Sequence, residues 1–113
     1  QFLIYPVITM KDQFTHKGSR TNLLGEKFNQ EDIDAYSCEL LVKGDTPDAF
    51  IVCAIDDKSV NPEGNAFEYW KANCMAEIHI FPESGHGFGI LSAYGTAKNW
   101  QNMSIDWLKT YQK

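Results

Sequence analysis

The feature that most constrains the fold is a continuous apolar run from Ala49 to Ile55, which two aspartates follow at once. A strand with one solvated face alternates apolar and polar residues. This run does not alternate, which is typical of a strand covered on both faces in a parallel sheet. A second strand is predicted over residues 77–81, and a third over residues 2–5, ended by Pro6 because proline cannot donate to a ladder.

Helical patterns lie after two of these predicted strands. A helix from about residue 62 to 73 is predicted by three residues at i, i+3 and i+4 spacing: Phe67, Trp70 and Lys71. A last helix over residues 96–111 is predicted by one apolar face: Trp100, Met103, Trp107 and Leu108. Strands joined through helices form right-handed parallel crossovers, so the sequence predicts an α/β fold with parallel strands and crossover helices.

The segment from about residue 10 to 45 differs from the rest. It is polar, carries Gly18 and Gly25, and has only weak helical patterning around residues 22–28. We expect a loop or cap excursion between the first two strands, with a short helix over residues 31–36.

Composition excludes several classes of protein. A net charge of −5 without any basic run argues against nucleic acid as a partner. No stretch approaches the ~20 apolar residues of a membrane helix, so we expect a soluble chain and leave its compartment open. The three cysteines lack Cys-x-x-Cys spacing, which argues against a disulfide framework or a zinc knuckle, and Cys53 is expected to be a buried, inert thiol.

Chemistry-bearing residues follow two of the predicted strands. Asp56 and Asp57 come after the first buried run, and His86 stands between two glycines after the run over residues 77–81. Carboxyl ends of parallel strands meet at one edge of a sheet, where α/β proteins keep their sites. His86 and one of these two aspartates are therefore the predicted catalytic pair, with His86 as general base and the acid orienting its imidazole.

The chain holds no Gly-x-Ser-x-Gly, the pattern of a nucleophile elbow. Ser84 and Ser19 are rejected as nucleophiles because neither stands between a predicted strand and a helix. A metal site would have to gather residues without ligand spacing, namely Asp56, Asp57, His79, Glu83 and His86. We predict no metal and no cofactor.

Several segments together resemble a known family. They are Tyr5–Met10, Thr15–Gly25, Asp56–Val60 and Gly85–Gly89, and together with the sequences of the predicted strands they span most of the chain. The sequence resembles the α/β-hydrolase esterases of the acetylxylan-esterase and bacterial lipase/esterase group, often described as xylanase-like or prolyl-oligopeptidase-like.

This resemblance implies roles for two residues. It makes His86 the triad base, and Asp57, directly before Lys58, the triad acid, with Asp56 as the fallback. Two departures stand near the pair: Asn61 separates Val60 from Pro62, and Ser84 replaces a glycine common in the family.

The resemblance also implies that residues 1–113 are the C-terminal portion of a single α/β-hydrolase domain. In that interpretation the chain begins inside a strand, and the nucleophile elbow and oxyanion hole lie before Gln1.

The leading functional hypothesis is a serine carboxylic-ester hydrolase that acts on a small ester such as an acetylated sugar. One alternative is a serine peptidase of the prolyl-oligopeptidase type, which shares the order of acid and histidine. The other is a noncatalytic, truncated hydrolase module that pairs with a second copy through its exposed strand edge.

Overall fold

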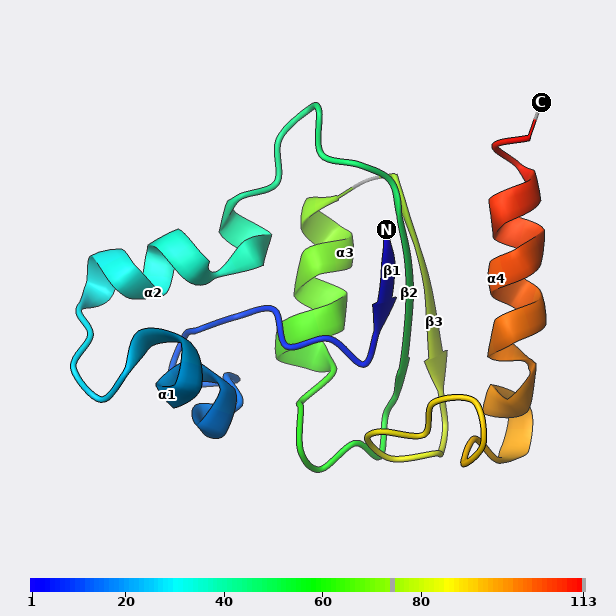
Figure 1. Ribbon diagram of the computed structural model, residues 1–113, viewed down its shortest axis with the longest axis horizontal. Helices are drawn as coiled ribbons and strands as arrows, with labels where there is room; N and C mark the ends of the chain where they lie inside the picture. The colour runs from blue at the N-terminus through cyan, green and yellow to red at the C-terminus, as the bar shows by residue number, and fades with distance from the viewer. Residues whose placement is uncertain (74, 113) are drawn as a thin grey trace.

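The computed structural model describes residues 1–73 and 75–112. Three strands form one parallel sheet in the order β1-β2-β3, with β1 at Phe2–Ile4, β2 at Ala49–Ala54 and β3 at Ala76–Phe81 (Figure 1). Every residue of the central strand β2 is buried, as its continuous apolar sequence predicts. The predicted α/β fold with parallel strands is confirmed.

The three strands run in the same direction, so their carboxyl ends meet at one edge. Phe2 pairs with Phe50 across β1 and β2, and Ala54 pairs with Phe81 across β2 and β3. The loops that follow β2 and β3 therefore emerge together, at the lower edge of the sheet in Figure 1.

Helices cover both faces of the sheet. On one face lies a helix that begins as a π-helical turn at Glu63–Phe67 and continues as α3 at Glu68–Ala72. On the other face lies α4 at Trp100–Lys109, preceded by a 3₁₀ turn at Gly95–Asn99 (Figure 1). Both helices are present where the sequence predicts them, although residue spacing does not distinguish π and 3₁₀ turns from α-helix. In α3, Tyr69 is buried, whereas Trp70 and Lys71 of the predicted face are exposed.

Alternate residues of β2 supply the two halves of the core. The half beneath α3 contains Ala49, Ile51 and Cys53, packed with Ile8, Ala66 and Tyr69. The half beneath α4 contains Phe50, Val52 and Ala54, packed with Phe81, Phe88 and Ala97 and flanked by Trp100, Met103 and Trp107. Because both faces of β2 are buried, residues of this part of the chain become accessible to solvent only beyond the ends of the strand.

The excursion between β1 and β2 is more helical than its sequence indicated. It contains α1 at Lys17–Leu24, α2 at Gln30–Tyr36 and a 3₁₀ turn at Cys38–Leu40, on the α3 side of the sheet (Figure 1). The short helix expected over residues 31–36 is present within α2. The helix α1 lies earlier in the sequence than the weak helical pattern around residues 22–28, because Gly25, at φ 79°, ends it.

One buried side chain ties this excursion to the helix at α3. Asn65 accepts hydrogen bonds from the backbone N–H groups of Ile8 (2.8 Å) and Thr9 (3.0 Å). Its amide nitrogen donates to the carbonyls of Phe14 (3.0 Å) and Asn61 (2.9 Å). A single residue thus satisfies four backbone groups of segments that are far apart in the sequence.

Among residues 1–73 and 75–112, no helix has both the length and the apolar character needed to cross a bilayer.

Candidate active site

Asp57 lies in the turn that follows β2, where its backbone N–H donates to the carbonyl of Ala54 (3.2 Å). One carboxylate oxygen, Oδ1, accepts hydrogen bonds from the backbone N–H groups of Ser59 (2.8 Å) and Val60 (2.9 Å). Such bonding to the residues two and three positions ahead is what makes aspartate a good turn residue. The turn therefore fixes the carboxylate and leaves its second oxygen available.

The imidazole of His86 contacts that second oxygen, Oδ2. Its Nδ1 lies 2.7 Å from Asp57 Oδ2. The Asp57 side chain is 1% exposed and the His86 side chain is 34% exposed, so solvent reaches the imidazole but not the carboxylate. An ionised carboxylate can only accept, which places the hydrogen of a neutral ring on Nδ1 and leaves Nε2 as the acceptor.

The loop after β3 presents this imidazole through backbone conformations that favour glycine. Gly85 and Gly87, on either side of His86, have φ values of 64° and 75°. Phe88 then anchors the loop by burying its ring in the core beneath α4. Trp100 adds a hydrogen bond from its indole nitrogen to the carbonyl of Gly89 (2.9 Å).

Tyr5, just after β1, is a contact of His86 that sequence reasoning missed. Its ring centroid lies 4.8 Å from that of His86 and 5.0 Å from that of Phe88, both in edge-to-face arrangements. Its φ of 40° is uncommon for a residue with a side chain, and such conformations cluster at functional sites. The only sequence signal is its place at the carboxyl end of a strand, directly before a proline.

Asp56, the fallback acid, does not face the imidazole. Its Oδ1 accepts hydrogen bonds from the backbone N–H groups of Ser84 (3.1 Å) and Gly85 (2.8 Å). The structure thus gives two adjacent aspartates different partners, and only Asp57 contacts His86.

The other residues considered as metal ligands do not join the pair. His79 lies within β3, where its Nε2 is 2.7 Å from Glu77 Oε1 and its ring packs against Phe50. Glu83 is exposed. Within the described part of the chain, no three histidine, cysteine or acidic side chains come close enough to hold a metal ion.

Neither rejected serine is placed as a nucleophile. The Ser84 hydroxyl is bonded to the backbone of Tyr94, and that of Ser19 lies 2.9 Å from His16 Nδ1 in the cap of α1. In that cap the imidazole of His16 also accepts a hydrogen bond from the Ser19 backbone (3.2 Å), which is a capping role.

Cys38 is exposed and Cys53 is buried, both as free thiols, whereas Cys74 lies outside the described residues. Burial, followed by the negative charge of Asp57, raises the pKa of the Cys53 thiol to about 12. The expectation of a buried thiol at Cys53 is confirmed, and such a thiol is a poor nucleophile at neutral pH.

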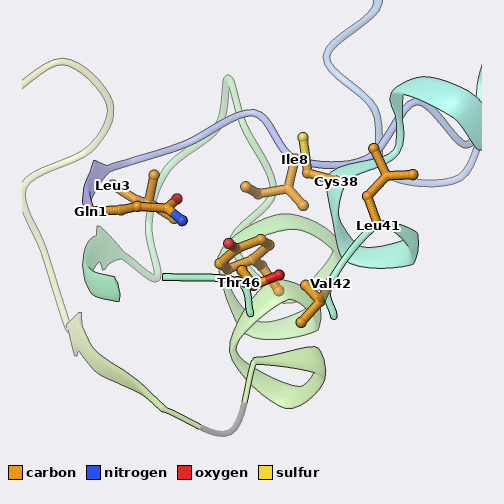
Figure 2. A pocket seen from close by; sticks show the side chains of 8 residues that line it. Gln1, Leu3, Ile8, Cys38, Leu41, Val42 and Thr46 are labelled. Atoms are coloured by element: carbon orange, nitrogen blue, oxygen red, sulfur yellow. The ribbon is translucent and has the colours of Figure 1, made fainter. Parts of the chain in front are cut away.

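A cavity of about 250 Å³ lies away from the pair, on the α3 side of β1 (Figure 2). It is mostly apolar and is lined by Gln1, Leu3, Ile8, Cys38, Leu41, Val42, Thr46 and Tyr69. No carboxylate or imidazole side chain lines it, so the Asp57–His86 pair lies outside this cavity.

A parallel sheet with helices on both faces, an acid after one strand and a histidine after the next, is an arrangement found in the α/β-hydrolase fold. Comparison with known proteins agrees with this class. No family model matches the chain. An acetylxylan esterase of Xylanibacter ruminicola is 33% identical over 96% of this chain, which spans 24% of that protein.

Solved structures show the same relationship. An acetyl ester-xyloside bifunctional hydrolase from Caldicellulosiruptor lactoaceticus superposes with a TM-score of 0.90 at 32% identity, over 96% of this chain and 41% of that chain. A carboxylesterase from Lactobacillus plantarum shares the fold, with a TM-score of 0.76 at 22% identity over 96% of this chain and 43% of its own. Over the part that it matches, the chain is similar in sequence and fold to α/β-hydrolase esterases of the acetylxylan-esterase group.

Proposed function

We propose that this chain supplies the acid and the base of a serine carboxylic-ester hydrolase that removes acetyl groups from carbohydrate. The observation that carries the proposal is the 2.7 Å contact between His86 Nδ1 and the buried Asp57 carboxylate. The names of two relatives, an acetylxylan esterase and an acetyl ester-xyloside hydrolase, support the choice of substrate.

In this mechanism His86 acts through Nε2, the ring nitrogen turned away from Asp57. It takes the proton of a serine hydroxyl as that oxygen attacks the acetyl carbonyl, and returns the proton to the departing sugar oxygen. Water then attacks the acetyl-serine, His86 takes a proton from that water, and acetate leaves as the serine oxygen is reprotonated. Asp57 holds the imidazole in the required tautomer and stabilises its protonated form.

We place the serine in a segment outside these 113 residues. The sequence holds no Gly-x-Ser-x-Gly, and the chain spans 24% of the acetylxylan esterase and 41% of the solved bifunctional hydrolase. In this proposal, residues 1–113 are the C-terminal portion of one α/β-hydrolase domain.

The test is acetate release from acetylated xylan by the full natural polypeptide that contains this chain. His86→Ala is expected to lower kcat by at least about 10³-fold, because loss of one triad member removes most of the activity of the unit. His79→Ala is the matched control, a histidine of the same sheet that lies outside the pair, and should keep kcat within about threefold. Full acetate release by His86→Ala would refute the proposal.

A second experiment addresses the missing nucleophile. The 113-residue chain alone should not release acetate from an activated acetyl ester above the rate of free imidazole. Turnover by this chain that disappears in His86→Ala would place the nucleophile among residues 1–113 and contradict the proposed division.

A further inference from the structure

The loop that carries His86 is fastened to the turn that carries Asp57 by a second set of contacts. Asp56 Oδ1 accepts the two consecutive backbone N–H groups of Ser84 (3.1 Å) and Gly85 (2.8 Å). Gly85 directly precedes His86, so this carboxylate holds the backbone one residue from the proposed base.

The far end of the same loop is also held. The Ser84 hydroxyl donates to the carbonyl of Tyr94 (3.1 Å) and accepts from the Tyr94 backbone N–H (3.0 Å). The Tyr94 phenol in turn lies 3.4 Å from Asp56 Oδ2. Asp56, Ser84 and Tyr94 therefore form a closed ring of hydrogen bonds, which we call the loop clamp.

The loop clamp maintains a backbone conformation that its sequence does not favour. Ser84 has a φ of 145°, in the region that favours glycine, and its residue is 7% exposed. A strained residue persists only where its surroundings determine its conformation. At Ser84 this conformation is held by the two hydrogen bonds of its hydroxyl and by the hydrogen bond from its N–H to Asp56.

We propose that Asp56 is a positioning residue that sets the direction of the His86 imidazole by holding the Ser84 and Gly85 amides. This inference rests on the proposed function, in which His86 Nε2 must meet a serine hydroxyl. Asp57 fixes the ring at Nδ1, whereas Asp56 fixes the backbone directly before His86, on the side of the loop opposite to the Phe88 anchor. The adjacent aspartates thus divide the work between side chain and main chain.

Isosteric substitutions at the two aspartates separate these roles in the full natural polypeptide. Asp57→Asn should lower kcat by about 10⁴-fold, as expected when the amide reverses the tautomer of the histidine. Asp56→Asn keeps a carbonyl oxygen for both loop amides and should keep kcat within about threefold. A loss above tenfold in Asp56→Asn would overturn the positioning role and indicate that the charge itself is required.

Removing or displacing the Asp56 oxygen that accepts the two loop amides should lower kcat more than Asp56→Asn does. Asp56→Ala is expected to lower kcat by about 10- to 100-fold with KM within about threefold, since a misplacement of about 1 Å can cost 10²-fold. Asp56 is exposed, so a longer side chain fits at this position. Asp56→Glu keeps the charge but moves the carboxylate oxygen that accepts the two amides, and it replaces Asp56→Ala as the test if the alanine variant does not fold. Wild-type kcat in Asp56→Ala, or in Asp56→Glu, would overturn the proposal.

A spectroscopic readout separates failure of the inference from failure of the proposed function. The hydrogen that His86 Nδ1 shares with Asp57 should give a slowly exchanging, downfield proton resonance, assigned by its loss in His86→Ala. The resonance should persist in Asp56→Asn and broaden in Asp56→Ala and Asp56→Glu. An unchanged resonance in both disruptive variants refutes positioning, whereas the expected pattern in a protein without esterase activity refutes only the proposed function.

Discussion

Two aspartates with identical side chains, Asp56 and Asp57, acquire different environments through one step along the chain. Asp57 turns inward, with a side chain that is 1% exposed, whereas Asp56 points outward to the loop after β3. The sequence allowed a choice of Asp57 only through the family resemblance, because Asp-Asp-Lys-Ser is good turn composition whichever residue faces the histidine. The pairing of Asp56 with the Ser84 and Gly85 amides depends on tertiary contact and has no local sequence signal.

Tyr5 offers a prediction about the surroundings of His86. Among the described residues its phenol oxygen has no hydrogen bond, so Tyr5→Phe should change the free energy of unfolding by less than about 0.5 kcal/mol. Tyr5→Ala removes two edge-to-face contacts, each worth about 0.5–1.5 kcal/mol beyond burial, and should lower that free energy by about 1–3 kcal/mol. Urea denaturation of the pair measures both; equal stability of the two variants would show that the ring contacts contribute nothing.

The two described cysteines should differ in reactivity. Cys53 is buried and its pKa is raised to about 12, while Cys38 is exposed although partial burial and the charge of Glu39 raise its pKa as well. With iodoacetamide at pH 8, peptide mapping should find Cys38 alkylated in the folded protein and Cys53 only after unfolding. Alkylation of native Cys53 at the rate of Cys38 would show that the core beneath α3 opens readily.

At the scale of elements, the strands and α4 were predictable because each has a single dominant apolar pattern. The helix at α3 was predicted from Phe67, Trp70 and Lys71, but its buried face is formed by Ala66 and Tyr69. The run Ala49–Ile55 indicated both its strand and its double coverage. The excursion was not predictable in this way, since α1 and α2 are held by caps and side-chain bonds instead of a strong apolar face. Asn29 and Asp32 form a capping box at α2, and Asn65 binds the excursion from outside.

Asn65 is therefore expected to stabilise the junction between the excursion and α3. Asn65→Ala leaves the buried N–H groups of Ile8 and Thr9 without their acceptor, each at a cost of about 1–3 kcal/mol. The free energy of unfolding should therefore fall by about 2–6 kcal/mol. Asn22→Ala, at an exposed position of α1, is the matched control and should change it by less than about 0.5 kcal/mol.

The stability of the chain is expected to depend on pH through Tyr111, which lies just beyond the carboxyl end of α4. The hydrogen bond from Tyr111 to Asp48, followed by desolvation and the charges of Asp48 and Glu77, raises the pKa of this phenol from 10.0 to about 12. Because the folded-state pKa is the higher one, this contribution to stability is complete below pH 10 and is lost as the pH rises through about 12.

Thermal melts of the wild type and Tyr111→Phe should therefore differ below pH 10 and converge toward pH 12. Comparing the two proteins removes the contribution of other groups that titrate in this range. A difference that stays constant from pH 8 to pH 12 would contradict the role of the Tyr111 hydrogen bond.

At the scale of the whole molecule, some of the exposed apolar surface lies at the open sides of the sheet. β1 and β3 are the outer strands, and exposed apolar residues lie on or next to them: Phe2 (46%) on β1, Ile80 (42%) on β3, and Ile55 (59%), whose N–H bonds to the carbonyl of Phe81. Unpaired edges and contiguous apolar surface favour association with another chain. We predict that the 113-residue chain alone binds a hydrophobic dye and associates with a second copy through β1.

A pair of charge substitutions tests which surface is responsible. Phe2→Lys places a charge on the outer strand, and Leu91→Lys places the same charge on an exposed loop. Light scattering should show a larger fall in average mass for Phe2→Lys than for Leu91→Lys. A wild-type chain that is monomeric and binds no dye would contradict the prediction.

The order of the strands also bears on how the molecule assembles in time. Asp57 and His86 are 29 residues apart, whereas Phe2 and Phe50, which pair between β1 and β2, are separated by 50 − 2 = 48 residues. Shorter chain closures carry a smaller entropy cost and form sooner. Pulsed hydrogen exchange during refolding should therefore protect the amides of β2 and β3 before those of β1, so that the acid meets the imidazole before the sheet acquires its first strand.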